Sequence, residues 1–181
     1  MIAVPVVGQG PHNVLCLHGW FGYSQGWGSL TDYVDSTSFR YAFLDYRGYG
    51  ASKQITGNYS VEELAQDALA TADRLGWKEF SLIGHSMGGM AIQKVLALAP
   101  ERVRKLVGIN PIPATGYPFD EAGWNFFSSA AENPEVRYAI LDLTTGKRLT
   151  PTFIQQIVAS SFANSTQEAF AAYLSTWGKS N

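Results

Sequence analysis

The sequence predicts an α/β fold, in which a mostly parallel sheet is flanked by helices and followed by an α-helical cap. Up to Ile109, short apolar segments alternate with segments of helical periodicity, an order that is typical of a parallel sheet. The last of these apolar segments, Arg102–Ile109, is largely apolar, as expected for a strand that is covered on both faces. After Pro113 only helical patterns follow.

Turn residues and helix caps divide the first part of the chain into elements. The turn-forming run 8–11 separates the first two strands, and 26–34 is expected to form a short helix. Ser60 and Glu63 form a capping box at the start of a helix that has one apolar face and ends at Gly76. Met87–Leu98 is a second helix, which ends before Pro100. The expected strands are Val4–Val7, Asn13–Leu17, Arg40–Asp45, Glu79–Ile83 and Arg102–Ile109.

Helical segments alone fill the rest of the chain. The expected helices are Glu121–Glu132, Pro134–Leu143, Pro151–Phe162 and Thr166–Trp177. We therefore predict a core at residues 1–112 and a helical cap, or lid, at residues 113–181. If Arg102–Ile109 is the last core strand, the sheet is incomplete on its C-terminal side, and an unpaired apolar edge favours association with another chain.

Composition favours an ordinary globular domain. The 181 residues carry a net charge of −2, so neither nucleic acid nor an anionic membrane is an expected partner. Cys16 is the single cysteine, which excludes an intramolecular disulfide. The chain shows no signal-peptide pattern and no long apolar stretch, and we expect a soluble, cytoplasmic protein. No metal-ligand spacing or phosphate-binding loop is present, and we expect neither metal nor cofactor.

Ser86 is the candidate nucleophile. It lies in Gly84-His85-Ser86-Met87-Gly88, which fits the pattern G-x-S-x-G and stands between a predicted strand and a predicted helix. A serine hydroxyl must be exposed and oriented in order to attack, and a sharp turn between strand and helix achieves this. The small residues Gly84 and Gly88 let the chain bend without a Cβ clash.

Two backbone N–H groups are candidates for an oxyanion hole. His18-Gly19-Trp20 follows the predicted central strand, so the N–H of Trp20 is expected to lie near Ser86. The N–H of Met87 follows the nucleophile directly. Together they would bind the negative oxygen of a tetrahedral intermediate.

The three motifs His18-Gly19-Trp20, Asp45-Tyr46-Arg47-Gly48-Tyr49-Gly50-Ala51-Ser52 and Gly84-His85-Ser86-Met87-Gly88-Gly89 resemble the α/β-hydrolase superfamily, in particular its small bacterial esterase-like branch. The resemblance implies serine hydrolase chemistry and places the helical run after Pro113 where that family inserts its cap. It also implies that the segment from Asp45 to Arg47 is mainly structural.

The rest of a catalytic triad is not found in this sequence. The family's triad runs in the order serine, acid, histidine, whereas His12, His18 and His85 all precede Ser86. The position near Asn110, where some relatives carry the acid, holds an amide, and Asp120 and Asp142 fall in the cap, where they are expected to be solvated helix-end acids. We hypothesise that the chain is the N-terminal piece of a longer hydrolase, inactive alone, whose partner is a complementing C-terminal fragment or a self-associated copy.

The aromatic residues of the predicted cap indicate the polarity of the substrate. Most of them are expected to be core residues, but a cap roofs the site, so an apolar lid favours small, fairly apolar carboxylic esters. Lactone hydrolysis, carbon–carbon bond hydrolysis and cofactor-free perhydrolysis share the scaffold and stay open. The alternative class is a non-enzymatic ligand-binding module or a decayed hydrolase, which the missing histidine favours if the chain is the whole gene product.

Overall fold

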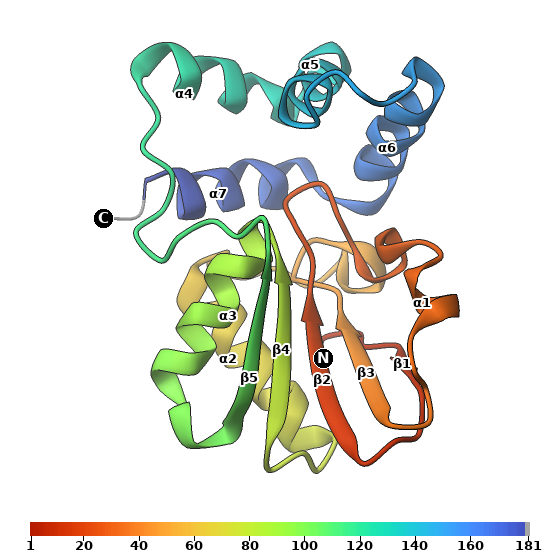
Figure 1. The fold of residues 1–181 in the computed structure, drawn as a ribbon. Coiled ribbons are helices and arrows are strands. Elements are labelled where there is room, and N and C mark those ends of the chain that lie inside the picture. The colour runs from red at the N-terminus through yellow and green to blue at the C-terminus, as the bar shows by residue number, and fades with distance from the viewer. Residues whose placement is uncertain (180–181) are drawn as a thin grey trace.

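Five strands form one sheet in the order β1-β3-β2-β4-β5 in the computed structural model, which describes residues 1–179. β1 pairs antiparallel with β3, and the other strand pairs are parallel (Figure 1). The strands are β1 (Val6–Val7), β2 (His12–Leu17), β3 (Phe39–Leu44), β4 (Phe80–His85) and β5 (Val103–Ile109). The predicted α/β fold with a mostly parallel sheet is therefore confirmed.

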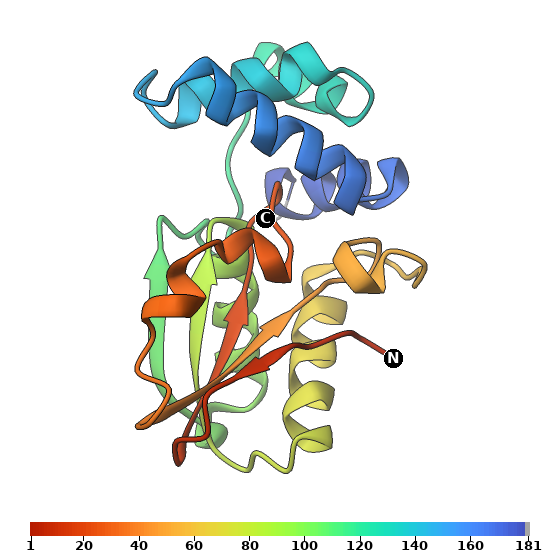
Figure 2. The ribbon, with the colours of Figure 1, turned by 90° about the vertical axis from the view of Figure 1, so that its right-hand side faces the viewer.

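Two long helices cover one face of this sheet. They are α2 (Val61–Arg74) and α3 (Met87–Leu98), and Figure 2 shows α2 on the side of the sheet opposite to the one-turn helix α1 (Leu30–Tyr33). The capping box forms, but the glutamate side chain bonds to the N–H of the residue before the N-cap Ser60 and not to that of Ser60 itself. Ser60 Oγ accepts a hydrogen bond from the N–H of Glu63 (3.1 Å), and the Glu63 carboxylate accepts one from the N–H of Tyr59 (2.9 Å).

A short helix forms within the expected range 26–34, but it begins only at Leu30. A 3₁₀ turn, η1 (Ser24–Trp27), is followed by Gly28 at φ +58°, and only then does α1 begin. A positive φ interrupts a right-handed helix, so the glycine divides the segment in two. The first strand is also shorter than the expected Val4–Val7. Two further 3₁₀ turns are η2 (Gly50–Ser52) and η3 (Pro100–Arg102).

The four helices expected after Pro113 are present above the carboxyl ends of the strands (Figure 1). The first of them ends earlier than predicted and continues as a 3₁₀ turn. Each of the four helices begins at a residue whose side chain accepts a hydrogen bond from the first turn, as expected for N-caps. They are α4 (Glu121–Ser128) with η4 (Ser129–Ala131), α5 (Pro134–Thr144), α6 (Pro151–Asn164) and α7 (Gln167–Gly178).

α7 packs against the core, and α5 and α6 form an apolar cluster of their own. Phe170, Tyr173 and Trp177 of α7 are buried in the same cluster as the side chains that support the sheet. A separate cluster joins α5 and α6 through Leu141 and Ile154. The division into a core at 1–112 and a cap at 113–181 stays a prediction, and its last two residues lie outside the described residues.

β5 is an open edge. Within the part of the chain that the structure describes, no strand pairs with its outer side. Its side chains are exposed from Arg104 onward, and Val107 retains 48% of its surface in solvent. The expectation of an incomplete sheet is thus confirmed. None of the helices in residues 1–179 is long and apolar enough to cross a membrane.

Candidate active site

Ser86 occupies a strained turn between β4 and α3. Its backbone has φ +53° and ψ −117°, outside the regions that a residue with a Cβ normally adopts. Such strain persists only where the surrounding structure enforces it, and it is concentrated at functional sites. The sequence motif and the backbone conformation therefore agree on the same residue.

Close packing explains the glycines on both sides of this turn. A Cβ at Gly84 would lie 2.3 Å from the carbonyl oxygen of Gly88, and a Cβ at Gly88 would lie 2.2 Å from that of Leu17. Both contacts are to backbone atoms, which cannot move aside as a side chain can. The first turn of α3 thus packs directly against the end of β2, and only glycine permits this approach.

Three backbone hydrogen bonds hold the turn in place. The N–H of Ser86 donates to the carbonyl of Ile109 (3.0 Å) at the end of β5. The carbonyl of Ser86 accepts from Gly89 (2.8 Å) and from Ile112 (3.0 Å). The edge strand and the loop after it therefore fix the serine backbone.

The loop after β2 lies against the same turn. A Cβ built on Gly19 would approach His85 Nδ1 to 2.8 Å and Ser86 Cβ to 3.2 Å, so the two motifs are in contact. The backbone N–H groups of Trp20 and Met87 have no hydrogen-bond acceptor among residues 1–179. Both groups are thus free to donate to a bound molecule.

Aromatic side chains fix the conformation of Trp20. Its ring is buried and stacks on Phe170 of α7 with 4.1 Å between the ring centroids. Its indole Nε1 donates to the carbonyl of Phe170 (2.7 Å), and its own carbonyl accepts from the hydroxyl of Tyr49 (2.9 Å). The backbone at this position is therefore held from two separate segments of the chain.

The segment from Asp45 to Arg47 supports neighbouring loops. The buried Asp45 carboxylate accepts hydrogen bonds from the N–H and the hydroxyl of Ser24 (2.6 and 2.9 Å) and from the N–H of Ala51 (3.0 Å). Arg47 donates to both carboxylate oxygens of Asp67 on α2 (2.8 and 2.9 Å). These contacts tie the loops to the core and leave neither side chain directed to Ser86.

No histidine or acidic side chain is paired with the Ser86 hydroxyl in the described part of the chain. His12 is the first residue of β2, at the opposite end of the sheet, where its Nε2 lies 2.7 Å from Ser81 Oγ. His85 is the last residue of β4 and is exposed.

His18 is held as a neutral side chain. It is 3% exposed, and its ring stacks on Tyr46 with 3.8 Å between centroids. Nδ1 lies 2.8 Å from the carbonyl oxygen of Gly19, so Nδ1 carries the proton. Burial is the main reason that the pKa of His18 falls from 6.5 to about 4. A neutral ring turned into the core supports the loop around Gly19 and Trp20.

None of the candidate acid positions makes a hydrogen bond with a histidine that could serve as its triad partner in the described residues. Asp120 is exposed and accepts a hydrogen bond from the N–H of Gly123 (2.7 Å), which makes it the N-cap of α4. Asp142 lies within α5, and Asn110 stands exposed after β5 at φ +45°. Asp120 therefore has a structural role and Asn110 is exposed, while the half-buried Asp142 makes no hydrogen bond with Ser86.

Sequence reasoning missed the support that Trp20 receives. Phe170 contacts Trp20 on one side and packs on the buried guanidinium of Arg137 on the other, with Cζ 3.6 Å from the ring centroid. The helical spacing of aromatic residues in α7 predicts a buried face, but no local pattern indicates a partner 150 residues away. This part of the site follows only from the fold.

Comparison with known proteins identifies the family to which this chain belongs. Residues 12–138 match the family model described as the alpha/beta hydrolase fold. A serine hydrolase-like protein from Danio rerio is 35% identical over 96 residues, which are 52% of this chain and 29% of that protein. A pimeloyl-(acyl-carrier protein) methyl ester esterase from Pectobacterium carotovorum is 34% identical over 107 residues, 59% of this chain and 39% of that protein.

A solved structure shows the same fold over nearly the whole chain. The bromoperoxidase from Bacillus anthracis superposes with a TM-score of 0.82 at 22% identity and covers 98% of this chain. The match takes up 69% of that chain. The matches to the two curated relatives take up about a third of the length of each of those proteins.

Proposed function

Because this chain belongs to the α/β-hydrolase fold family, we propose that it is the nucleophile-bearing part of a serine hydrolase whose attacking atom is Ser86 Oγ. The observation that carries the proposal is the strained backbone of Ser86 between β4 and α3, next to two unpaired N–H groups. A hydroxyl beside two free donors suits the attack on a carbonyl and the binding of the oxyanion that forms.

The reaction is acyl transfer to the serine. Ser86 Oγ bonds to the carbonyl carbon of an ester while its proton passes to a general base, and the N–H groups of Trp20 and Met87 bind the resulting oxyanion. The bond to the alcohol then breaks, and the base returns the proton to the leaving oxygen. Water hydrolyses the acyl-enzyme and restores the serine. The apolar side chains around Trp20, including Phe21 and Phe127, favour small, fairly apolar carboxylic esters.

The general base comes from outside residues 1–181 in this proposal. All three histidines of the sequence precede Ser86, and His18 is neutral and turned into the core. The open edge of β5 adjoins the turn, because its last residue, Ile109, bonds to the backbone of Ser86. A further segment of a longer polypeptide or a second copy of this chain that pairs with β5 would end beside the serine. Without a base, kcat should be on the order of a millionfold lower than that of the same enzyme with a complete triad.

A serine-reactive fluorophosphonate tests the nucleophile. After prolonged incubation, peptide mass spectrometry should find the adduct on Ser86 as the major product, because its turn adjoins the two N–H groups that have no acceptor within residues 1–179. Ser86→Ala should reduce the total adduct at least tenfold. Ser128→Ala, which removes a half-buried hydroxyl on α4, should leave the labelling unchanged. Equal labelling of the Ser86→Ala variant and the parent protein would end the proposal.

A non-enzymatic binding module is the second candidate function. The observation that favours it is the absence of any histidine after Ser86 in the sequence. Such a module has no need of a strained serine, whose conformation costs about 1–3 kcal/mol. The two functions differ in one result, since a binding module would give no preferential adduct on Ser86.

A further inference from the structure

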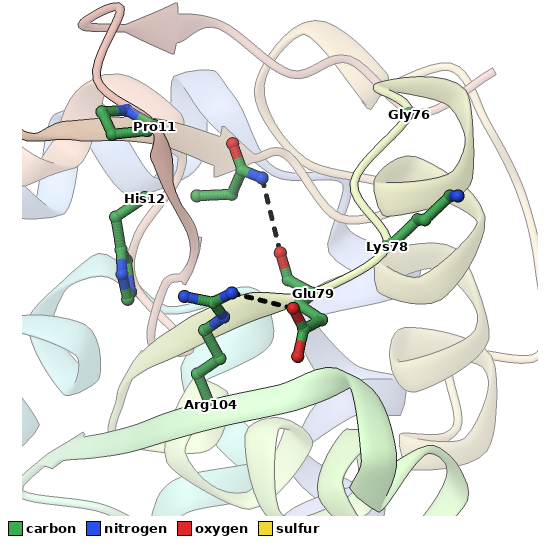
Figure 3. A pocket seen from close by; sticks show the side chains of 7 residues that line it. Pro11, His12, Gly76, Lys78, Glu79 and Arg104 are labelled. Atoms are coloured by element: carbon green, nitrogen blue, oxygen red, sulfur yellow. Dashed lines mark hydrogen bonds and ion pairs between the residues drawn. The ribbon is translucent and has the colours of Figure 1, made fainter.

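A polar cavity lies at the end of the sheet opposite to Ser86. It has a volume of about 250 Å³ and is formed at the amino ends of β2, β4 and β5. Figure 3 shows its side chains, among them His12, Glu79 and Arg104. Nothing in the proposed hydrolase reaction uses these residues.

An irregularity in the sheet gives Arg104 its position. Phe80 pairs with Val103, but Leu82 pairs with Leu106, so β5 has one residue more than β4 over this interval. Such a β-bulge changes the direction of the side chains that follow it. The guanidinium of Arg104 lies between the His12 ring and the Glu79 carboxylate (Figure 3).

Hydrogen bonds hold the walls of the cavity but leave donors unused. Arg104 donates one bond, from Nη2 to the Glu79 carboxylate (2.8 Å), and its other N–H groups have no acceptor within residues 1–179. His12 Nε2 is held by Ser81 Oγ, and the ring packs edge-on against Phe39, while Nδ1 has no partner in the same part of the chain. Two nitrogen groups from different strands are therefore available to one bound molecule.

The charges of the lining residues indicate the kind of ligand. Lys78 and Arg104 are positive and Glu79 is negative, and Arg104 neutralises the carboxylate by direct contact. Among the described residues no cluster of three or more histidine, cysteine or acidic side chains is present that would hold a metal ion. A guanidinium with free N–H groups in a polar cavity suits an oxyanion.

We propose that this cavity binds a small oxyanion, phosphate or carboxylate, through Arg104 and His12. The site lies at the amino ends of the strands, whereas Ser86 follows the carboxyl end of β4, so the two sites are separate. The ligand enters from solvent, because Arg104 and Glu79 are each about half exposed. Glu79 weakens the site, since it repels the anion and occupies part of the guanidinium.

NMR titration of the chain with inorganic phosphate tests the site, with sodium acetate as a second arm and sodium chloride at equal ionic strength as the reference. The signals of His12 and of the Arg104 side chain should shift and reach saturation. Arg104→Gln should lower the association constant at least tenfold, as the loss of a charge-assisted hydrogen bond implies. Glu79→Gln should raise it several-fold.

Matched controls separate this site from general surface charge. Arg148→Gln and Glu121→Gln alter exposed charges elsewhere and should leave the association constant unchanged. Saturation by phosphate alone, or by acetate alone, identifies which oxyanion the cavity accepts and supports the site in either case. Shifts equal to those in chloride, or equal affinities in the Arg104→Gln and Arg148→Gln variants, would overturn the proposal.

Discussion

Replacing Gly88 by alanine is expected to destabilise the chain by about 3 kcal/mol or more, because the new methyl group has no space. Its Cβ would lie 2.2 Å from the carbonyl oxygen of Leu17 and 2.7 Å from that of His18. Both atoms belong to the backbone at the end of β2, so relief requires α3 to move away from the sheet. The same movement would displace the N–H of Met87 and the Ser86 hydroxyl.

Urea unfolding followed by circular dichroism measures this effect. Gly26→Ala is the matched control, since its Cβ would meet nothing closer than the Tyr23 ring at 3.3 Å. That variant should change the free energy of unfolding by less than about 1 kcal/mol. An unfolding midpoint for Gly88→Ala equal to that of the parent protein would show that the turn is not packed as described.

Acidification is expected to destabilise the chain through His18. Burial holds the pKa of this residue at about 4 in the folded protein, against about 6.5 when unfolded. The unfolded chain therefore takes up a proton first as the pH falls. The stability that His18 contributes is complete above pH 6.5 and is lost progressively down to about pH 4, by about 3 kcal/mol over the whole interval.

The variant His18→Gln separates this effect from the titration of carboxyl groups. Its stability at pH 7.5 should be lower than that of the parent, but the difference between the two proteins should shrink as the pH falls from 6.5 to 4.5. Parallel stability curves for His18→Gln and the parent protein would contradict the account of His18.

The sequence was sufficient to predict the parts of the fold that depend on local patterns. The apolar strands, the capped helix after Ser60 and the turn at Ser86 each have a short-range signal, and each forms in the structure. The late start of the helix within 26–34 also has a local cause, the positive φ of Gly28. The sequence alone does not distinguish this glycine from one with helical backbone angles. Helix and strand limits otherwise shifted by a few residues at most.

The contacts that support the site from distant parts of the chain could not be predicted from the sequence. The bond from Trp20 to the carbonyl of Phe170 and the stack of Phe170 on Arg137 join segments that no periodicity relates. The hydrogen bond between Ser86 and Ile109 is of the same kind, because it depends on the register of β4 and β5. These contacts follow from tertiary packing, which decides the geometry around the serine.

The most direct test of the central claim asks whether Ser86 lacks only a base. Imidazole in solution supplies a general base of the missing type, and a site with its nucleophile and oxyanion donors in place should use it. The rate of fluorophosphonate adduct formation on Ser86 is measured by mass spectrometry at increasing imidazole concentrations, with Ser86→Ala and Ser128→Ala as controls.

We predict slow labelling without imidazole and at least a tenfold faster, Ser86-specific reaction with it, unchanged by Ser128→Ala. Fast labelling that imidazole does not alter would show that residues 1–181 already contain a base. No adduct on Ser86 at any imidazole concentration would show that the serine is not a poised nucleophile.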